Sequence, residues 1–188
     1  MMNITLYHRP GTRSERTKRL LELMALPFEL REVGASDAET PAYRALNPFG
    51  TVPTLDLDGR ILVESAGQLM ALADLRPEAG LAPKPGTMER ALYYDGFVFA
   101  VATLEPAFVA WMERPKDAER EARRDRALRA MEERAGTPFA VGGRLTALDV
   151  LLHWQLAFLA TRGLLEHCPR SRAGLEGITR VLTERGVL

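Results

Sequence analysis

Residues 52–63 read Val-Pro-Thr-Leu-Asp-Leu-Asp-Gly-Arg-Ile-Leu-Val, two short strand-like runs separated by Asp58-Gly59. An Asp-Gly pair suits the two-residue turn of a β-hairpin, because both central residues of that turn adopt positive φ. The spacing therefore predicts that residues 52–57 and 60–63 pair as antiparallel strands. Ser65-Ala-Gly-Gln68 follows directly and has the pattern of a capping box, which predicts a helix immediately after the hairpin.

The chain before the hairpin has the pattern of a strand, a helix and a second strand. Residues 3–7 are rich in β-forming side chains, and five apolar residues between positions 20 and 26 are placed at helical spacing. Residues 28–33 alternate apolar and polar side chains, as a half-buried strand does. Ser36-Asp-Ala-Glu39 then matches a capping box before a short helical segment at 43–46. The predicted element order is β-α-β-α-β-β-α.

The second half of the chain has a different character. Residues 76–87 contain three prolines and two glycines, which interrupt regular structure and are typical of a linker. Helical spacing of apolar residues follows in the segments 88–112, 117–135 and 147–161. The sequence therefore predicts a first domain over residues 1–77, a linker over 78–87 and an all-helical domain over 88–188.

Composition excludes several classes of protein. The 188 residues are 46% hydrophobic and 27% charged, as in ordinary globular proteins. The 25 basic residues balance 25 acidic ones, so no basic excess favours nucleic acid. The longest uncharged apolar stretches, 96–104 and 150–161, are shorter than the roughly 20 residues of a membrane span. Cys168 is the one cysteine and cannot form an internal disulfide, so we expect a cytoplasmic protein. The three histidines lack metal-ligand spacing, so we expect no metal.

Three separated motifs resemble those of the glutathione transferases. Asn-Pro-Phe-Gly-Thr-Val-Pro-Thr-Leu at 47–55 resembles the family's NPxGxVPxL segment, Glu64-Ser65 resembles its Glu-Ser pair, and Leu145-Thr-Ala-Leu-Asp149 resembles its Thr-x-x-Asp capping box. The resemblance implies an α/β thioredoxin-like N-terminal domain with a mixed four-stranded sheet, followed by an all-α C-terminal domain. It also implies that Pro53 is cis, although an isolated X-Pro bond is usually trans.

The same resemblance implies which residues bind glutathione. The backbone of Val52, before Pro53, is expected to pair with the cysteinyl unit as a short antiparallel strand. Ser65 at a helix N-terminus is expected to bind the γ-glutamyl carboxylate, and Glu64 the α-ammonium group. Ser65 could equally cap its helix with Gln68, and the two roles are compatible. Thr51 stands where the family often has Gln or Lys, which predicts one weaker contact.

A hydroxyl donor would be needed to ionise the glutathione thiol, whose pKa is about 8.5 when free. Tyr7 ends the first predicted strand, where tyrosine-type relatives have their donor. Thr12 and Ser14 follow the loop after that strand, where serine-type relatives have theirs. These three are the candidate catalytic residues. Thr12-Arg-Ser-Glu15 also has the pattern of a capping box, so the absence of any donor stays open.

Arg13 departs from the bacterial cysteine-type relatives, because it stands where their cysteine would be. Residues 9–19 contain five basic side chains and one acidic one, which favours an anionic ligand. Arg13 is therefore expected to contact the glycyl carboxylate or to stabilise the thiolate.

The resemblance implies a cytoplasmic, homodimeric detoxification enzyme that activates glutathione, its co-substrate, for attack on small hydrophobic electrophiles. Phe108 and Trp111 are the candidate residues of the electrophile pocket, although aromatic residues at helical spacing also form cores. A specialised glutathione-dependent isomerase or dehalogenase has the same pattern. The alternative is a non-catalytic binding or interaction protein with the glutathione transferase fold, since Arg13 replaces the cysteine.

Overall fold

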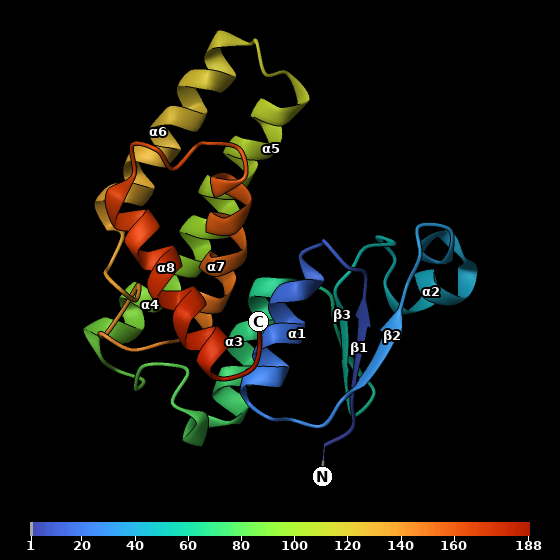
Figure 1. Cartoon of the computed structure of the whole chain (residues 1–188). Helices are drawn as coiled ribbons and strands as arrows, with labels where there is room; N and C mark the ends of the chain where they lie inside the picture. Colours follow the sequence, from blue (N-terminus) through green and yellow to red (C-terminus); the bar gives the residue numbers. More distant parts are fainter. Residues whose placement is uncertain (1) are drawn as a thin grey trace. The chain divides into compact units, whose positions relative to one another are not determined.

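A computed structural model of the chain describes residues 2–188 and shows two compact units (Figure 1). The first unit comprises residues 2–79 together with residues 185–187, and the second comprises residues 80–184 with Leu188. The boundary between residues 79 and 80 lies inside the segment rich in proline and glycine.

The first unit contains a mixed four-stranded sheet. Its strands are β1 (Ile4–His8), β2 (Glu29–Glu32), β3 (Thr54–Leu57) and β4 (Arg60–Leu62). Their order across the sheet is β2-β1-β3-β4; β1 and β2 are parallel, and the β1–β3 and β3–β4 pairs are antiparallel. Asp58 and Gly59 both have positive φ, as the predicted hairpin turn requires. The predicted sheet and its hairpin are confirmed. The half-buried character predicted for the second strand is wrong, because all four residues of β2 are exposed.

Helices cover both faces of this sheet. The helical segments are α1 (Ser14–Leu23), η1 (Asp37–Glu39), α2 (Pro41–Leu46), α3 (Ser65–Leu75) and η2 (Pro77–Ala79). Figure 1 shows α1 and α3 on one face of the sheet and α2 on the other. Because side chains alternate along a strand, Leu6 and His8 are buried on one face of β1, whereas Tyr7 packs on the other face beside Tyr43.

The capping boxes predicted at residues 36–39 and 65–68 are wrong. Glu64, not Ser65, is the N-cap of α3, and its side chain makes no capping hydrogen bond. Gln68 is fully buried and donates to the carbonyl oxygens of other segments instead. Residues 36–39 form the short η1 turn, and α2 is capped by Thr40, whose hydroxyl oxygen accepts from the backbone N–H of Tyr43 over 3.3 Å.

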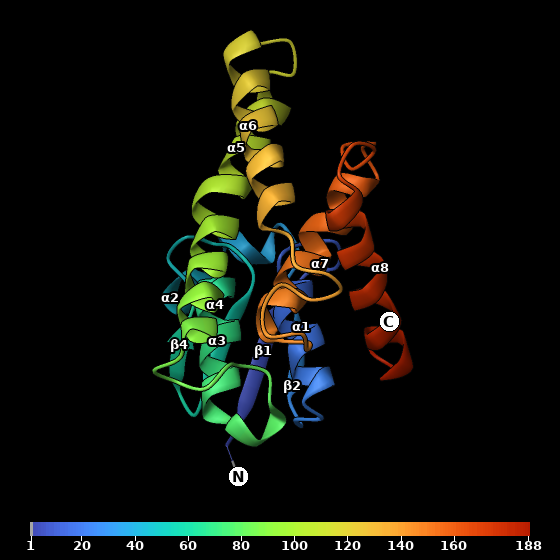
Figure 2. The same cartoon turned by 90° about the vertical axis from the view of Figure 1, so that its left-hand side faces the viewer.

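The second unit is helical, as predicted. Its helices are α4 (Met88–Val98), the π-helical η3 (Phe99–Leu104), α5 (Glu105–Glu113), α6 (Ala118–Arg134), α7 (Ala147–Ala160) and α8 (Pro169–Glu184). In Figure 2, α4 and α5 follow one another along one path beside α6. Buried side chains from these helices, among them Leu104, Phe108, Met131 and Leu156, form the core of the unit.

The continuous helix over residues 88–113 is long and apolar enough to cross a membrane by length and composition, and 28% of its most apolar window is buried. The sequence did not predict this because Asp95 and Glu105 interrupt its apolar runs. Tyr93, Phe97 and Ala100 of this helix are buried.

The predicted capping box at the start of α7 is confirmed. The carboxylate of Asp149 accepts from the backbone N–H and from the hydroxyl of Thr146, each over 2.7 Å, and from the backbone N–H of Ala140 over 2.7 Å. Burial raises the pKa of Asp149 to about 6, although these hydrogen bonds favour its ionised form.

Candidate functional site

A series of polar side chains occupies the junction between β1 and α1. The Thr12 hydroxyl donates to the Arg9 carbonyl oxygen over 2.7 Å, and its oxygen lies 2.8 Å from Oγ of Ser14. Oγ of Ser14 lies 2.8 Å from Nδ1 of His8 and accepts from the backbone N–H of Arg9 over 3.1 Å. Thr12 is half-buried, whereas Ser14 and His8 are 0% and 3% exposed. The series therefore runs from a half-buried hydroxyl to a buried ring.

Both acidic and basic side chains lie near the buried imidazole of His8 and act on its pKa. Burial lowers its pKa, while Glu15, whose Oε1 lies 3.8 Å from Nε2 of His8, acts in the opposite direction. Lys18 lowers the pKa further, and Glu32 and Glu22 raise it. The net direction is downward, so the ring is neutral at neutral pH.

The expected capping box between Thr12 and Glu15 does not form. Arg13, which is exposed, is the N-cap of α1, and its side chain makes no capping hydrogen bond. A carboxylate oxygen of Glu15 accepts from the backbone N–H of Gly11 over 3.3 Å instead. Gly11 has φ +74°, which glycine adopts without steric cost. The Thr12 hydroxyl oxygen accepts a long hydrogen bond of 3.4 Å from the backbone N–H of Ser14, the first residue of α1, without a return bond from Glu15.

The segment before β3 carries the motif at residues 47–55. The Val52–Pro53 peptide bond is cis. The Thr51 carbonyl oxygen accepts from the Tyr43 hydroxyl over 2.7 Å and from the Asn47 amide over 2.8 Å, which anchors the segment. β4 pairs only with Leu55–Leu57, so Val52 lies beyond its end. Among residues 2–188, no hydrogen-bond partner is found for the backbone N–H or C=O of Val52.

The Glu64-Ser65 motif lies at the start of α3. Glu64 is exposed at the N-cap, and Ser65 is buried directly after it. The Ser65 hydroxyl oxygen accepts from Nη1 of Arg16 over 3.4 Å. Arg16 is the largest fully buried side chain of the chain's described residues, and it belongs to α1. A buried cation therefore reinforces the positive end of α3 at Ser65.

Gln68 joins α1, the cis-proline segment and the start of α3. Its side-chain oxygen accepts from the Thr17 hydroxyl of α1 over 2.7 Å. Its amide donates to the Pro53 carbonyl oxygen over 3.3 Å and to the Leu62 carbonyl oxygen over 2.8 Å. The first turns of α1 and α3 and the cis-proline segment are thus held together by buried hydrogen bonds.

Tyr7 does not join this group. Its ring lies on the opposite face of the sheet, 5.7 Å from that of Tyr43, and its hydroxyl accepts from Nη1 of Arg31 over 3.4 Å. Alternation along β1 explains the separation, because His8 and Tyr7 are neighbours in sequence and point in opposite directions. The structure brings Thr12 and Ser14 together and leaves Tyr7 apart.

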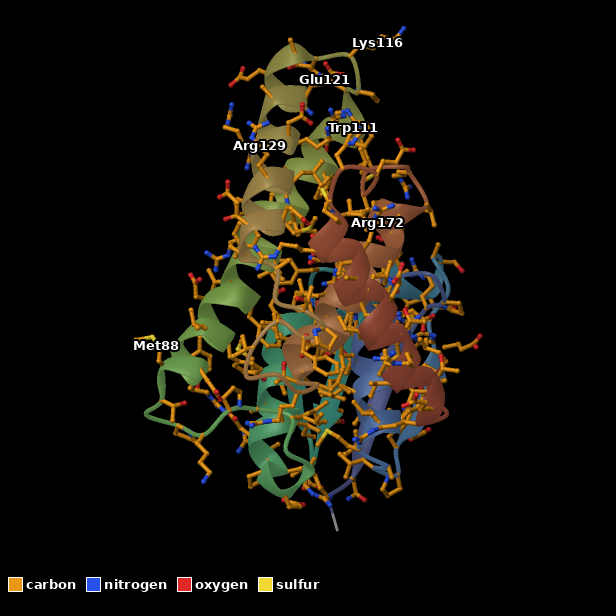
Figure 3. The ribbon with its side chains drawn as sticks, turned by 60° about the vertical axis from the view of Figure 1, so that its left-hand side comes forward. Met88, Trp111, Lys116, Glu121, Arg129 and Arg172 are labelled. Atoms are coloured by element: carbon orange, nitrogen blue, oxygen red, sulfur yellow. The ribbon has the colours of Figure 1, made fainter. Side chains whose placement is uncertain are left out.

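Phe108 and Trp111 belong to the core of the helical unit. Phe108 is 5% exposed. Trp111, labelled in Figure 3, is half-buried, and the guanidinium carbon of Arg124 lies 4.7 Å from its ring centre. The same unit contains an apolar cavity of about 240 Å³ lined by residues that include Phe99, Met131, Leu152 and Ile178. Neither Phe108 nor Trp111 is among the residues that line it.

Sequence reasoning missed His8, Arg16 and Gln68. The alternation of Ile4, Leu6 and His8 was a signal that His8 points into the interior. In residues 2–188, no group of three or more His, Cys, Asp or Glu side chains is placed to hold a metal ion.

Comparisons with known proteins agree with this arrangement. A family model described as the glutathione S-transferase N-terminal domain matches residues 12–75. A glutathione S-transferase of Xanthomonas campestris is 37% identical over 103 residues, which are 55% of this chain and 50% of that protein. The match thus spans half the length of this relative.

Solved structures match over nearly the whole chain. A glutathione transferase from Methylococcus capsulatus is 30% identical with a TM-score of 0.80, and the match covers 98% of this chain and 100% of that one. A sphingomonad glutathione S-transferase complexed with glutathione is 26% identical with a TM-score of 0.78, over 98% and 100% of the two chains. The fold, the three motifs and this full-length similarity lead to one conclusion: the chain belongs to the glutathione S-transferase family.

Proposed function

We propose that the protein is a glutathione transferase, which binds glutathione on its first unit and ionises the thiol for attack on small hydrophobic electrophiles. The observation that carries the proposal is the convergence of three segments, the β1–α1 junction, the cis-proline segment and the start of α3, through Arg16, Thr17 and Gln68. Each segment offers a different group to one peptide-like anion: a hydroxyl, a free backbone edge and a helix N-terminus.

The binding roles follow from the chemistry of these groups. Val52 offers an unpaired backbone N–H and C=O to the cysteinyl unit, as in strand addition. Ser65, at the start of α3 and beside the buried Arg16, suits the γ-glutamyl carboxylate, and the exposed Glu64 suits the α-ammonium group. Arg13 is exposed at the start of α1 and would bind the glycyl carboxylate. Thr51 adds a weaker polar contact, and no metal takes part.

Thr12 is the donor that the geometry favours for the thiolate. Ser14 is fully buried, with Arg9, Thr12 and His8 already around its hydroxyl, and Tyr7 lies on the other face of the sheet. Thr12 is half-buried and precedes the N-terminus of α1, where a thiolate also gains from the positive end of the helix. A hydrogen bond to the charged thiolate is stronger than the neutral bond to the Arg9 carbonyl oxygen that it would replace.

The electrophile and a second copy of the chain would be the other partners. Phe108 and Trp111 stay the proposed aromatic residues of the electrophile pocket. Exposed apolar residues follow the helix over residues 88–113, and Met88, which projects from its start, is visible in Figure 3. A second copy could cover this face to form a homodimer. We place the protein in the cytoplasm, with detoxification as its role.

A non-catalytic glutathione-binding protein is the second candidate. Arg13 occupies the position of the cysteine in bacterial relatives, and the Thr12 hydroxyl already donates to the Arg9 carbonyl oxygen. Such a protein would bind glutathione through Val52 and Ser65 without ionising its thiol.

The ultraviolet absorbance of bound thiolate, titrated against pH, separates the two candidates. We expect the bound thiol to have a pKa at least about one unit below its free value of about 8.5. Thr12→Ala should restore the free value, Thr12→Ser should keep the low one, and the control Tyr7→Phe should behave as the parent protein. Binding without a shift in the thiol pKa supports the non-catalytic candidate, and absence of binding contradicts both.

A further inference from the structure

The hydroxyls of Thr12 and Ser14 and the imidazole of His8 form an unbroken series of hydrogen-bond contacts. The two oxygens are 2.8 Å apart, and Oγ of Ser14 is 2.8 Å from Nδ1 of His8. The backbone N–H of Arg9 donates to Oγ of Ser14 over 3.1 Å and fixes the central member. One end of the series is half-buried and the other is enclosed, so a proton that enters at Thr12 can reach His8 without crossing solvent.

We propose that His8 is the proton acceptor for the glutathione thiol, reached through Thr12 and Ser14. This inference rests on the proposed function, because it requires the thiol to contact Thr12. The thiol S–H bond breaks and its proton passes to Oγ1 of Thr12. The hydroxyl proton of Thr12 passes to Oγ of Ser14, and that of Ser14 passes to Nδ1 of His8. The products are a thiolate and an imidazolium, and no proton is released to the solvent.

The transfer reverses every hydrogen bond in the series. In the arrangement that the relay requires, Ser14 donates to Nδ1 of His8 at 2.8 Å rather than to the Arg9 carbonyl oxygen at 3.0 Å, and Thr12 donates to Ser14 rather than to the same carbonyl oxygen at 2.7 Å. After the transfer, Nδ1–H of His8 donates to Ser14, Ser14 donates to Thr12, and Thr12 donates outward to the thiolate. The step that forms the thiolate therefore also turns the Thr12 hydroxyl toward it.

The charges around His8 suit a ring that starts neutral and becomes charged. Glu15 and Glu22 of α1 and Glu32 of β2 favour the imidazolium, and Lys18 of α1 opposes it. The carboxylate of Glu15 lies 3.8 Å from Nε2, on the side of the ring away from Ser14. Burial keeps the pKa of the resting ring low, so it is unprotonated and able to accept a proton. Thiolate and imidazolium then stabilise one another, as in other paired thiol and imidazole groups.

Nuclear magnetic resonance of protein with ¹⁵N-labelled histidine rings tests this directly. The His8 signals are assigned by their loss in His8→Asn, because His153 and His167 remain. Saturation with glutathione should move the His8 signals toward those of an imidazolium, in proportion to the fraction of bound thiol that is ionised. S-methylglutathione has no thiol proton to transfer, so it should leave the ring neutral. A ring that only supports Ser14 would stay neutral with both ligands.

Proton release on binding gives a second readout, measured in weakly buffered solution with an indicator dye. His8→Asn places an amide near the position of Nδ1 and can hydrogen-bond Ser14, but it cannot accept the proton. The parent protein should release almost no proton for each thiolate formed, and His8→Asn should release close to one. Its thiolate fraction near pH 6.5 should fall by about tenfold, which corresponds to one unit of thiol pKa. Ser14→Ala should also break the relay, while Thr12→Ser should preserve it.

The outcomes separate this inference from the proposed function. A thiolate that forms in the parent protein while His8 stays neutral overturns the relay and leaves the transferase intact. Glutathione bound without ionisation overturns both. If His8→Asn does not fold, the His8 signals can be assigned by substituting His153 and His167 instead, and the comparison of glutathione with S-methylglutathione in the parent protein still decides the matter.

Discussion

The Thr17 hydroxyl of α1 donates to the side-chain oxygen of Gln68 on α3 over 2.7 Å, and both residues are fully buried. The Gln68 amide in turn donates to the carbonyl oxygens of Pro53 and Leu62. One amide group therefore satisfies a buried hydroxyl and two backbone carbonyls that come from three different segments. A buried polar group left without a partner is costly, so this side chain couples the stability of the first unit to the geometry of its site.

Replacing Gln68 with methionine should destabilise the first unit. Gln68→Met keeps the length of the side chain but leaves Thr17, Pro53 and Leu62 without their partner, which should cost about 2–4 kcal/mol of the free energy of unfolding. The Michaelis constant for glutathione should also rise, because Pro53 and the start of α3 lose their common support. Urea denaturation and steady-state kinetics measure the two effects.

The control is a double-mutant cycle with Thr17→Val. Each single variant leaves one member of the Thr17–Gln68 hydrogen bond buried without its partner, and the double variant removes both members. The double variant should therefore lose about 1 kcal/mol less free energy of unfolding than the sum of the two single losses. Additive effects would show that Thr17 and Gln68 do not interact energetically.

The fold was predictable because its signals are local. The run of β-forming residues at 3–7 and the Asp58-Gly59 turn are properties of adjacent residues, and each predicted an element that the structure contains. Thr146 and Asp149 form the expected capping box for the same reason, since both partners lie within one helical turn.

The site was less predictable because its hydrogen bonds are not local. Ser65-Ala-Gly-Gln68 has the pattern of a capping box, but Gln68 instead binds Thr17, which is 51 positions away in sequence. No pattern near Gln68 could reveal that partner. Thr12, Ser14 and Tyr7 were all candidates in the sequence, and Tyr7 is set apart in the structure because it lies on the face of β1 opposite His8, which Ser14 contacts.

Two glycines of α8 offer a matched test of packing in the helical unit. A Cβ atom at Gly177 would lie 2.5 Å from Cβ of Pro138, whereas a Cβ at Gly174 would meet nothing closer than 3.7 Å. Alanine in a helix is favoured over glycine by about 1 kcal/mol. Gly174→Ala should therefore stabilise the protein by up to about 1 kcal/mol, while Gly177→Ala should destabilise it by about 1–3 kcal/mol through overpacking.

Urea denaturation of the two variants measures this difference, and each serves as the control for the other. The proline ring cannot move aside as the end of a flexible side chain could. Equal stability of the two variants would mean that residues 136–138 shift freely to admit a methyl group, contrary to the packing in the structure.

Asp149 should make the stability of the helical unit depend on pH. Its folded pKa is raised from 3.8 to about 6, so the folded chain binds a proton more tightly than the unfolded chain does. The resulting stabilisation is complete below about pH 4 and is lost as the pH rises through about 6. The difference of about two pKa units corresponds to about 3 kcal/mol at most.

Comparison with Asp149→Asn isolates this contribution, because asparagine does not titrate. The variant should be less stable than the parent at about pH 4, since its amide faces the donors of Thr146 and Ala140. The stability of the parent relative to the variant should then fall by about 2 kcal/mol between about pH 4 and pH 7, because other carboxylates titrate equally in both proteins. Denaturation in urea across this range measures the difference. A gap that widens toward pH 7 would show that the hydrogen bonds of Thr146 and Ala140 outweigh burial and hold the pKa of Asp149 below its ordinary value.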